Sequence, residues 1–153
     1  MTRGTAELAA SLRAAGKSIA LANGLFDILH VGHLRYLEAA AREADVLVVA
    51  VNSDRSAREL KGAGRPVVPE RERAELLAGF RCVDHVIVFE EATVAGVLRE
   101  LRPDVHCKGT DYTPDSVPER GIAAELGIRI AIVGDPKRHA TRDMLSRIRL
   151  DQS

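Results

Sequence analysis

The chain has 153 residues, and we expect residues 1–153 to form one domain with an aliphatic core, because only 3% of them are aromatic. Its 22 basic and 22 acidic residues cancel, which argues against a protein that binds nucleic acid through bulk positive charge. No apolar stretch approaches the length of a membrane span and no signal segment is visible, so we expect a cytoplasmic protein without a membrane partner.

Apolar runs alternate with helical patterns along the chain. We expect strands at 18–22, 46–51, 85–89, 105–108 and 128–133. We expect helices at 34–42, 53–60, 70–80, 93–101 and 118–126, and a further one near the N-terminus. The strands are continuous Val, Ile and Leu runs, which is typical of parallel strands buried on both faces. The pattern therefore predicts an α/β fold, a Rossmann-like, doubly wound sheet of five parallel strands.

The first strand leads into NGLFDILHVGH at positions 23–33. His30 and His33 therefore stand where a strand ends and a helix begins. A helix N-terminus offers unpaired N–H groups and the positive end of the helix dipole, which favour phosphate. The same pair could instead supply two zinc ligands. No third ligand stands nearby at a suitable spacing, so we expect no metal held by the protein itself.

Polar residues also follow the later strands. Asn52 and Asp54 follow the second strand, where they could bind sugar hydroxyls or, with Ser53, cap the next helix. Lys108 ends the fourth strand, where a core role is hard to explain, and Gly109 would allow a ligand to approach closely. Because parallel strands end at one edge of a sheet, we expect these residues to converge on one ligand site.

These motifs resemble those of the HxGH nucleotidyltransferases, the cytidylyltransferase-like superfamily. The resemblance covers roughly residues 17–149 and includes the segments 48–54, 60–62, 65–66, 81–84 and 108–112. Within the superfamily, the motifs are most similar to those of the adenylyltransferases that join ATP and D-glycero-D-manno-heptose 1-phosphate to give ADP-heptose and pyrophosphate. The cytidylyltransferases that act on glycerol 3-phosphate or another polyol phosphate share much of the pattern, and a non-catalytic nucleotide-binding module is a further alternative.

The resemblance implies a role for each matched position. Expected catalytic residues are His30, His33 and Lys108. Expected nucleotide-binding residues are Asn23, Gly24, Phe26, Asp27, Gly32, Gly109, Asp111, Thr141 and Arg142. Expected acceptor-binding residues are Asn52, Lys61, Arg65 and Arg73. The resemblance also implies ATP or another nucleoside triphosphate and a sugar phosphate as substrates, and we expect a homodimer. The clustered phosphates of such a nucleotide imply Mg²⁺ that arrives with it.

Two single positions and one segment bear on this assignment. Asp27 either orients a histidine or a magnesium-linked group, or only shapes the loop. Thr110 stands where many relatives carry a second glycine. Ala140-Thr141-Arg142 replaces the usual Ser/Thr-rich turn before the final helix, and we expect Arg142 to contact the pyrophosphate end of the nucleotide in place of a lost hydroxyl.

Overall fold

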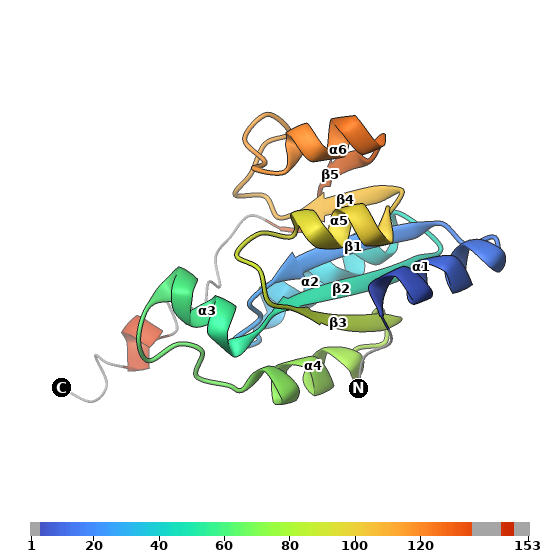
Figure 1. Cartoon of the computed structure of the whole chain (residues 1–153). Coiled ribbons are helices and arrows are strands. Elements are labelled where there is room, and N and C mark those ends of the chain that lie inside the picture. The colour runs from blue at the N-terminus through green and yellow to red at the C-terminus, as the bar shows by residue number, and fades with distance from the viewer. Residues whose placement is uncertain (1–3, 136–144, 149–153) are drawn as a thin grey trace.

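Five parallel strands form one sheet at the centre of the protein (Figure 1), in a computed structural model that describes residues 4–135 and 145–148. The strands are β1 (Ile19–Gly24), β2 (Val46–Asn52), β3 (His85–Phe89), β4 (Val105–Lys108) and β5 (Arg129–Ile132). Their order across the sheet is β3-β2-β1-β4-β5. The prediction of a doubly wound parallel sheet is thus confirmed, and β1 lies at its centre.

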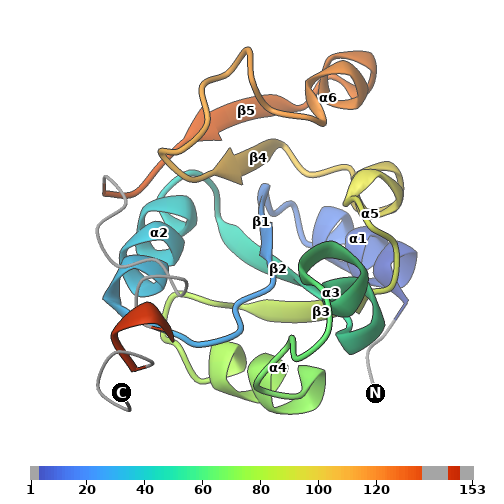
Figure 2. The same ribbon diagram turned by 90° about the vertical axis from the view of Figure 1, so that its left-hand side faces the viewer.

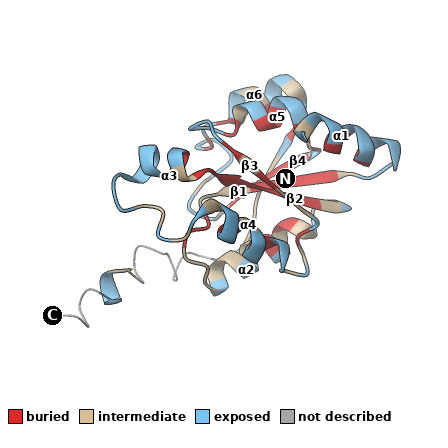
Figure 3. Ribbon diagram, turned by 60° about the horizontal axis from the view of Figure 1, so that its bottom comes forward, coloured by how far each residue is buried: buried red, intermediate tan, exposed pale blue. Residues whose placement is uncertain are grey.

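Helices cover both faces of the sheet (Figure 3). They are α1 (Thr5–Ala14), α2 (Val31–Ala41), α3 (Asp54–Lys61), α4 (Glu70–Ala78), α5 (Ala95–Leu101) and α6 (Arg120–Leu126). The helices α1, α5 and α6 pack on one face, and α2 and α4 pack on the other. None of the described helices is long and apolar enough to cross a membrane.

Two aliphatic cores result from the alternation of side chains along each strand. In β1, Ile19 and Leu21 join the core under α1, α5 and α6, whereas Ala20 and Ala22 join the core under α2 and α4. All four side chains are at most 1% exposed. Burial on both faces explains why the sequence shows continuous apolar runs rather than an alternating pattern.

Aspartates tie the strands together at the amino edge of the sheet. Asp45, Asp84 and Asp104 each directly precede a strand, β2, β3 and β4 respectively. Each carboxylate accepts a backbone N–H from the start of the neighbouring strand: Asp45 from Ser18, Asp84 from Leu47 and Asp104 from Ile19, at 2.8–2.9 Å. These bonds satisfy backbone donors that the parallel ladder leaves open.

The helix boundaries differ from the predicted ones where caps intervene. The helix predicted from residue 34 begins at Val31, because His30 acts as its N-cap. Ser53 caps α3 by accepting the Ser56 N–H at 3.1 Å, which confirms the capping expectation for this position. The helix predicted to reach residue 80 ends at Ala78, before Gly79.

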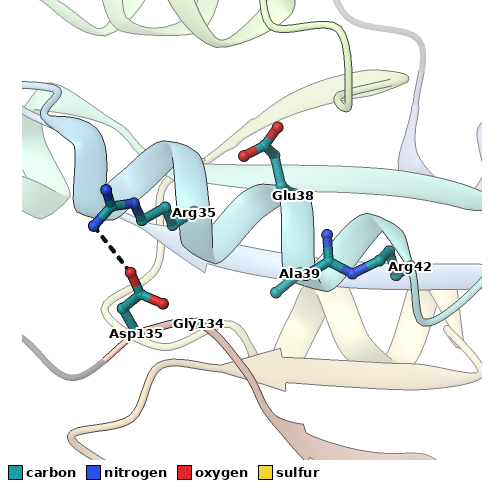
Figure 4. A pocket seen from close by; sticks show the side chains of 6 residues that line it. All are labelled: Arg35, Glu38, Ala39, Arg42, Gly134 and Asp135. Carbon is teal, nitrogen blue, oxygen red and sulfur yellow. Dashed lines mark hydrogen bonds and ion pairs between the residues drawn. The ribbon is translucent and has the colours of Figure 1, made fainter.

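The chain that leaves β5 crosses close to α2 at Gly134 (Figure 4). Gly134 has φ +96°, and a Cβ placed on it would lie 3.2 Å from the Cα of Tyr36. Next to it, Asp135 pairs with Arg35 of α2 at 3.0 Å. This crossing thus needs glycine for two reasons, its backbone conformation and its close approach. It fixes where the chain passes over the helix that begins at the paired histidines.

Gly134→Ala is expected to destabilise the protein by about 1–3 kcal/mol, because alanine meets both the left-handed conformation and the backbone of α2. Denaturant unfolding would measure the change. Gly121→Ala is the matched control: Gly121 lies in α6 with nothing within 4 Å of its added Cβ, so alanine there should stabilise by roughly 0.5–1 kcal/mol. Equal effects of the two substitutions would contradict this account of the crossing.

Candidate active site

Two groups of predicted site residues, those of the segment 23–33 and Lys108 with Gly109, lie at the carboxyl edge of the sheet, where β1 and β4 end. The strand order reverses between these two neighbouring strands, and ligands of doubly wound sheets bind at such a reversal. The segment 23–33 continues from β1 into α2, and Lys108 with Gly109 ends β4. Figure 2 looks onto this side of the molecule, with α2 on the left and α3 on the right.

The two histidines cap α2 with their own side chains. His30 Nδ1 accepts the Gly32 N–H at 3.1 Å, and His33 Nδ1 accepts the His30 N–H at 3.2 Å. The two imidazole rings lie 4.0 Å apart between centroids, at 31°. The arrangement is a capping box, with histidines at the positions that Ser or Thr and Glu usually occupy.

These bonds determine where each ring carries its proton. Since both Nδ1 atoms accept a backbone N–H, neither can hold a proton without breaking its bond. The neutral rings therefore carry their protons on Nε2, and each presents an N–H donor there. A second proton on either ring would also disrupt the first turn of α2. The arrangement thus provides neutral donors at a helix N-terminus, a combination suited to phosphate oxygens.

Phe26 supports His33 from one side. Its ring is buried, 5.5 Å from the His33 ring between centroids, and a Cβ on Gly24 would lie 3.3 Å from it. Phe26 itself has φ +51°, a conformation that side chains rarely adopt. Gly24 and Phe26, expected to bind nucleotide, therefore also shape the loop that places the histidines. Gly32 contributes through its N–H to the His30 ring.

Lys108 lies on the neighbouring strand β4 and is only 7% exposed. Its Nζ stands 4.5 Å from the centre of the Tyr112 ring, a cation–π distance, and burial raises the pKa of the Tyr112 hydroxyl, with further contributions from Asp111 and Glu119. A Cβ on Gly109 would lie 3.1 Å from an oxygen of Asp111. The lysine, glycine and aspartate predicted for this motif thus occupy one turn at the end of β4.

Thr110 has a structural contact that explains its departure from glycine. Its hydroxyl donates to the carbonyl oxygen of Asp135 at 2.7 Å. The turn after β4 is therefore bonded to the chain that follows β5. Tyr36 makes a comparable link, because its hydroxyl donates to the Cys107 carbonyl at 2.6 Å and joins α2 to β4. Burial raises the pKa of Tyr36, so this hydroxyl keeps its proton.

Asp27 holds the segment that follows α3. Its buried carboxylate accepts N–H groups from Val67 and Val68 at 2.9 Å, and from Arg65 Nε at 2.7 Å. Burial by itself would raise the pKa of Asp27, but these three donors outweigh it and lower the pKa below its ordinary value. Of the roles left open for Asp27, the structure shows the shaping of loops.

Arg73 is fully buried and joins four parts of the chain. It donates to the carbonyls of Val68, Leu25 and Asn52 at 2.6–2.8 Å, and to Asp54 Oδ1 at 2.9 Å. The Asn52 side chain is also buried and donates to Ser56 Oγ at 2.9 Å. The structure thus places both residues beneath the surface, where they hold loops. That these two residues bind the acceptor substrate, a sugar phosphate, stays a prediction.

The other two predicted acceptor residues lie nearer the solvent. Lys61 is exposed at the end of α3, and Arg65 is 22% exposed in its side chain while it pairs with Asp27. The remaining nucleotide-binding predictions, Thr141 and Arg142, lie outside the described residues. Within the described ranges, no group of three His, Cys, Asp or Glu side chains is placed to hold a metal ion.

A pocket of about 340 Å³ lies between α2 and the chain after β5 (Figure 4). It is lined by Arg35, Glu38, Ala39, Arg42, Gly134 and Asp135. None of the predicted site residues is among them, and its charges of both signs give no preference for an anion. This pocket is therefore separate from the ligand site predicted at the strand ends.

His106 is a residue that the sequence prediction missed. It lies in β4, is 0% exposed, and its Nε2 bonds to Asn23 Oδ1 at 2.8 Å. Burial, together with the nearby Lys108, lowers the pKa of His106 to about 3, so the ring is neutral. The available signal was a polar residue inside an apolar strand, two residues before Lys108.

Asp27→Asn is expected to cost about 1–3 kcal/mol of stability at neutral pH, because backbone donors lose a buried acceptor. The pKa of Asp27 is lowered from 3.8, so the carboxylate stabilises the fold above that pH and loses its contribution as the pH falls through the lower folded value. The stability gap between the variant and the wild type should therefore shrink below pH 3.8, as denaturant unfolding would measure. Asp115→Asn, at an exposed position, is the control; a gap that persists unchanged in acid would contradict this role.

The sequence of this chain is similar to that of known proteins. A model of the cytidylyltransferase-like family matches residues 21–141. The chain is 43% identical over 136 residues to the bifunctional protein HldE of Syntrophotalea carbinolica, covering 89% of this chain and 28% of that protein. It is 41% identical over 145 residues to the bifunctional protein HldE of Geobacter metallireducens, covering 95% of this chain and 30% of that protein.

A solved structure agrees with the fold. The lipopolysaccharide core biosynthesis protein of Thermoplasma volcanium superposes with a TM-score of 0.68 at 28% identity, covering 80% of this chain and 100% of that one. The chain thus spans less than a third of the length of the two HldE relatives, and it matches them over most of its own length. The resemblance inferred from the motifs is confirmed, and the chain belongs to the cytidylyltransferase-like family of nucleotidyltransferases.

Proposed function

We propose that this protein transfers the adenylyl group of ATP to D-glycero-D-manno-heptose 1-phosphate, giving ADP-heptose and pyrophosphate. The observation that carries nucleotidyl transfer is the pair of capping histidines at the strand-order reversal, beside Lys108 on the next strand. The choice of heptose rests on the order of motifs along the chain. The HldE relatives and the lipopolysaccharide core protein of T. volcanium support it.

The reaction needs charge stabilisation more than proton transfer. An anionic oxygen of the sugar phosphate attacks the α-phosphorus of the nucleotide, and the bond from that phosphorus to the bridging oxygen of the β-phosphate breaks. Pyrophosphate leaves with the electron pair, so no base has to remove a proton. The Nε2–H donors of His30 and His33, the N-terminus of α2 and the ammonium of Lys108 would stabilise the charge that develops.

The acceptor phosphate would lie near the cations that follow α3. Lys61 is exposed and Arg65 is anchored through Nε to Asp27, which limits the movement of its guanidinium. Asp27 and Arg73 hold the segment around them against the end of β1. We therefore assign acceptor binding to Lys61 and Arg65, and assign the support of this segment to Asp27 and Arg73.

Mg²⁺ is proposed to accompany the nucleotide. The described residues offer no three-ligand cluster, so phosphate oxygens would supply most of its ligands. When bound, the ion would neutralise part of the triphosphate charge. We also propose a homodimer and a cytoplasmic location. The dimer can be tested by measuring the molar mass in solution.

Pyrophosphate release over a matrix of four nucleoside triphosphates and several sugar and polyol phosphates tests the function. ATP with the heptose phosphate should give the highest kcat/KM. The highest value for CTP with glycerol 3-phosphate or another polyol phosphate would favour the cytidylyltransferase alternative. No release with any pair, despite nucleotide binding, would favour a non-catalytic module.

His33→Ala is expected to lower kcat by about 10²–10³, because one donor to the reacting phosphate is lost. Since the ring also caps α2, the thermal stability of the variant must be measured alongside its activity. His85→Ala is the matched control: His85 begins β3 at the opposite, amino edge of the sheet, so its loss should leave kcat unchanged. Activity of His33→Ala close to that of wild type would reject the phosphate role.

A further inference from the structure

A fully buried histidine lies beneath the proposed nucleotide site. In the sheet register, His106 of β4 stands opposite Leu21 of β1 and Ile130 of β5. Leu21 belongs to the apolar core under α1, α5 and α6, and the partly buried Ile130 packs against that core. An aliphatic residue would suit this position better, since a polar ring in an apolar core costs stability unless its nitrogens are bonded.

Within the part of the chain that the structure describes, one of the two ring nitrogens has a hydrogen-bond partner and the other has none. His106 Nε2 lies 2.8 Å from Asn23 Oδ1, and among the described residues Nδ1, although buried, has no hydrogen-bond partner. Because the amide oxygen can only accept, Nε2 must carry the proton and donate. The neutral ring is therefore fixed in the tautomer that leaves Nδ1 bare, and the protein retains this unpaired nitrogen at a cost.

The position of His106 links it to the proposed site. Asn23 lies two residues beyond Leu21 in β1, so it is the diagonal neighbour of His106 on the same face of the sheet. Lys108 lies two residues beyond His106 in β4, also on that face. His106 is thus one step deeper in the sheet than Asn23 and Lys108, at the point where the strand order reverses.

We propose that His106 is a positioning residue that fixes the amide of Asn23 with its oxygen inward and its NH₂ group available to the nucleotide. If the amide were rotated by 180°, its NH₂ group would face Nε2 and the ring proton would have to move to Nδ1. No described residue accepts a hydrogen bond at Nδ1, so the flipped form would bury an unpaired N–H donor. It would also turn the amide oxygen toward phosphate oxygens, which repel it. This inference rests on the proposed nucleotide-binding function of the site.

Kinetics of ATP in four variants test the proposal: His106→Leu, His106→Gln, Asn23→Ala and the double variant His106→Leu/Asn23→Ala. We expect His106→Leu to keep or raise the melting temperature and to lower kcat/KM for ATP by about tenfold, the effect of one hydrogen bond. His106→Gln should recover part of the loss, because its amide can donate from a similar place. In the Asn23→Ala background, His106→Leu should change kcat/KM by less than about twofold.

Ile130→Val is the matched control for a general disturbance of this core face. Ile130 is the other strand neighbour of His106, and its shortening should lower stability without changing kcat/KM for ATP. A His106→Leu variant with wild-type kinetics would overturn the proposal. The proposal would also be overturned if the losses in kcat/KM for ATP of the two single variants, His106→Leu and Asn23→Ala, multiplied in the double variant.

Two further measurements distinguish a failure of this proposal from misfolding of the variant and from a failure of the proposed function. If His106→Leu does not fold, ¹⁵N NMR of the wild-type imidazole decides: a proton on Nε2 is expected, and a proton on Nδ1 overturns the proposal. If the wild type transfers nucleotide to no acceptor, the proposed function fails. The calorimetric Kd for ATP then tests the inference, since equal values for wild type and His106→Leu would reject it.

Discussion

The structure depends on how backbone groups are satisfied where the parallel strands end. A parallel ladder leaves donors and acceptors without a strand partner at both edges of the sheet, and buried groups of this kind must bond elsewhere. At the carboxyl edge, Arg73 donates to carbonyls of three segments, and Asp27 accepts N–H groups from one of these, the segment at Val67 and Val68. Two buried charges thus hold together segments that lie up to 48 residues apart in the sequence.

The proposed chemistry is built on this support. The loop fixed by Asp27 and Arg73 leads directly into the histidines, and their backbone and side-chain bonds form the start of α2. Lys108 comes from the adjacent strand, which Tyr36 ties to α2 through the Cys107 carbonyl. Each donor is therefore held before any ligand binds, and little reorganisation is needed when charge develops on the phosphate.

Much of the fold could be predicted from the sequence, because the information was local. Strands buried on both faces appear as continuous aliphatic runs, and the Ser53 cap is recognisable from residue type and position. The three aspartates of the amino edge were also visible, each directly before a strand. What they bond could not be read locally, since the partner of Asp104 is 85 residues away.

The site was predicted less completely, for a related reason. The paired histidines and Lys108 stand in local motifs, whereas the roles of Asp27, Arg73 and His106 depend on distant partners. The segment Glu70–Arg73 contains two arginines, Arg71 and Arg73, which their immediate sequence neighbours do not distinguish. Helical periodicity separates them, because Arg73 lies four residues before Leu77, which is 0% exposed, and so shares its buried face.

The capping box at the start of α2 limits the substitutions that this protein can accept over evolution. Each imidazole here accepts a backbone N–H at the start of the helix through Nδ1, while Nε2 lies on the other side of the ring, where we propose that it donates to the nucleotide. Asparagine could imitate the first nitrogen and glutamine the second, but neither side chain reaches both positions. The spacing of three residues between the histidines is therefore set by helix geometry as well as by chemistry. A lineage that lost catalysis would still be under selection to keep a capping side chain at these two sites.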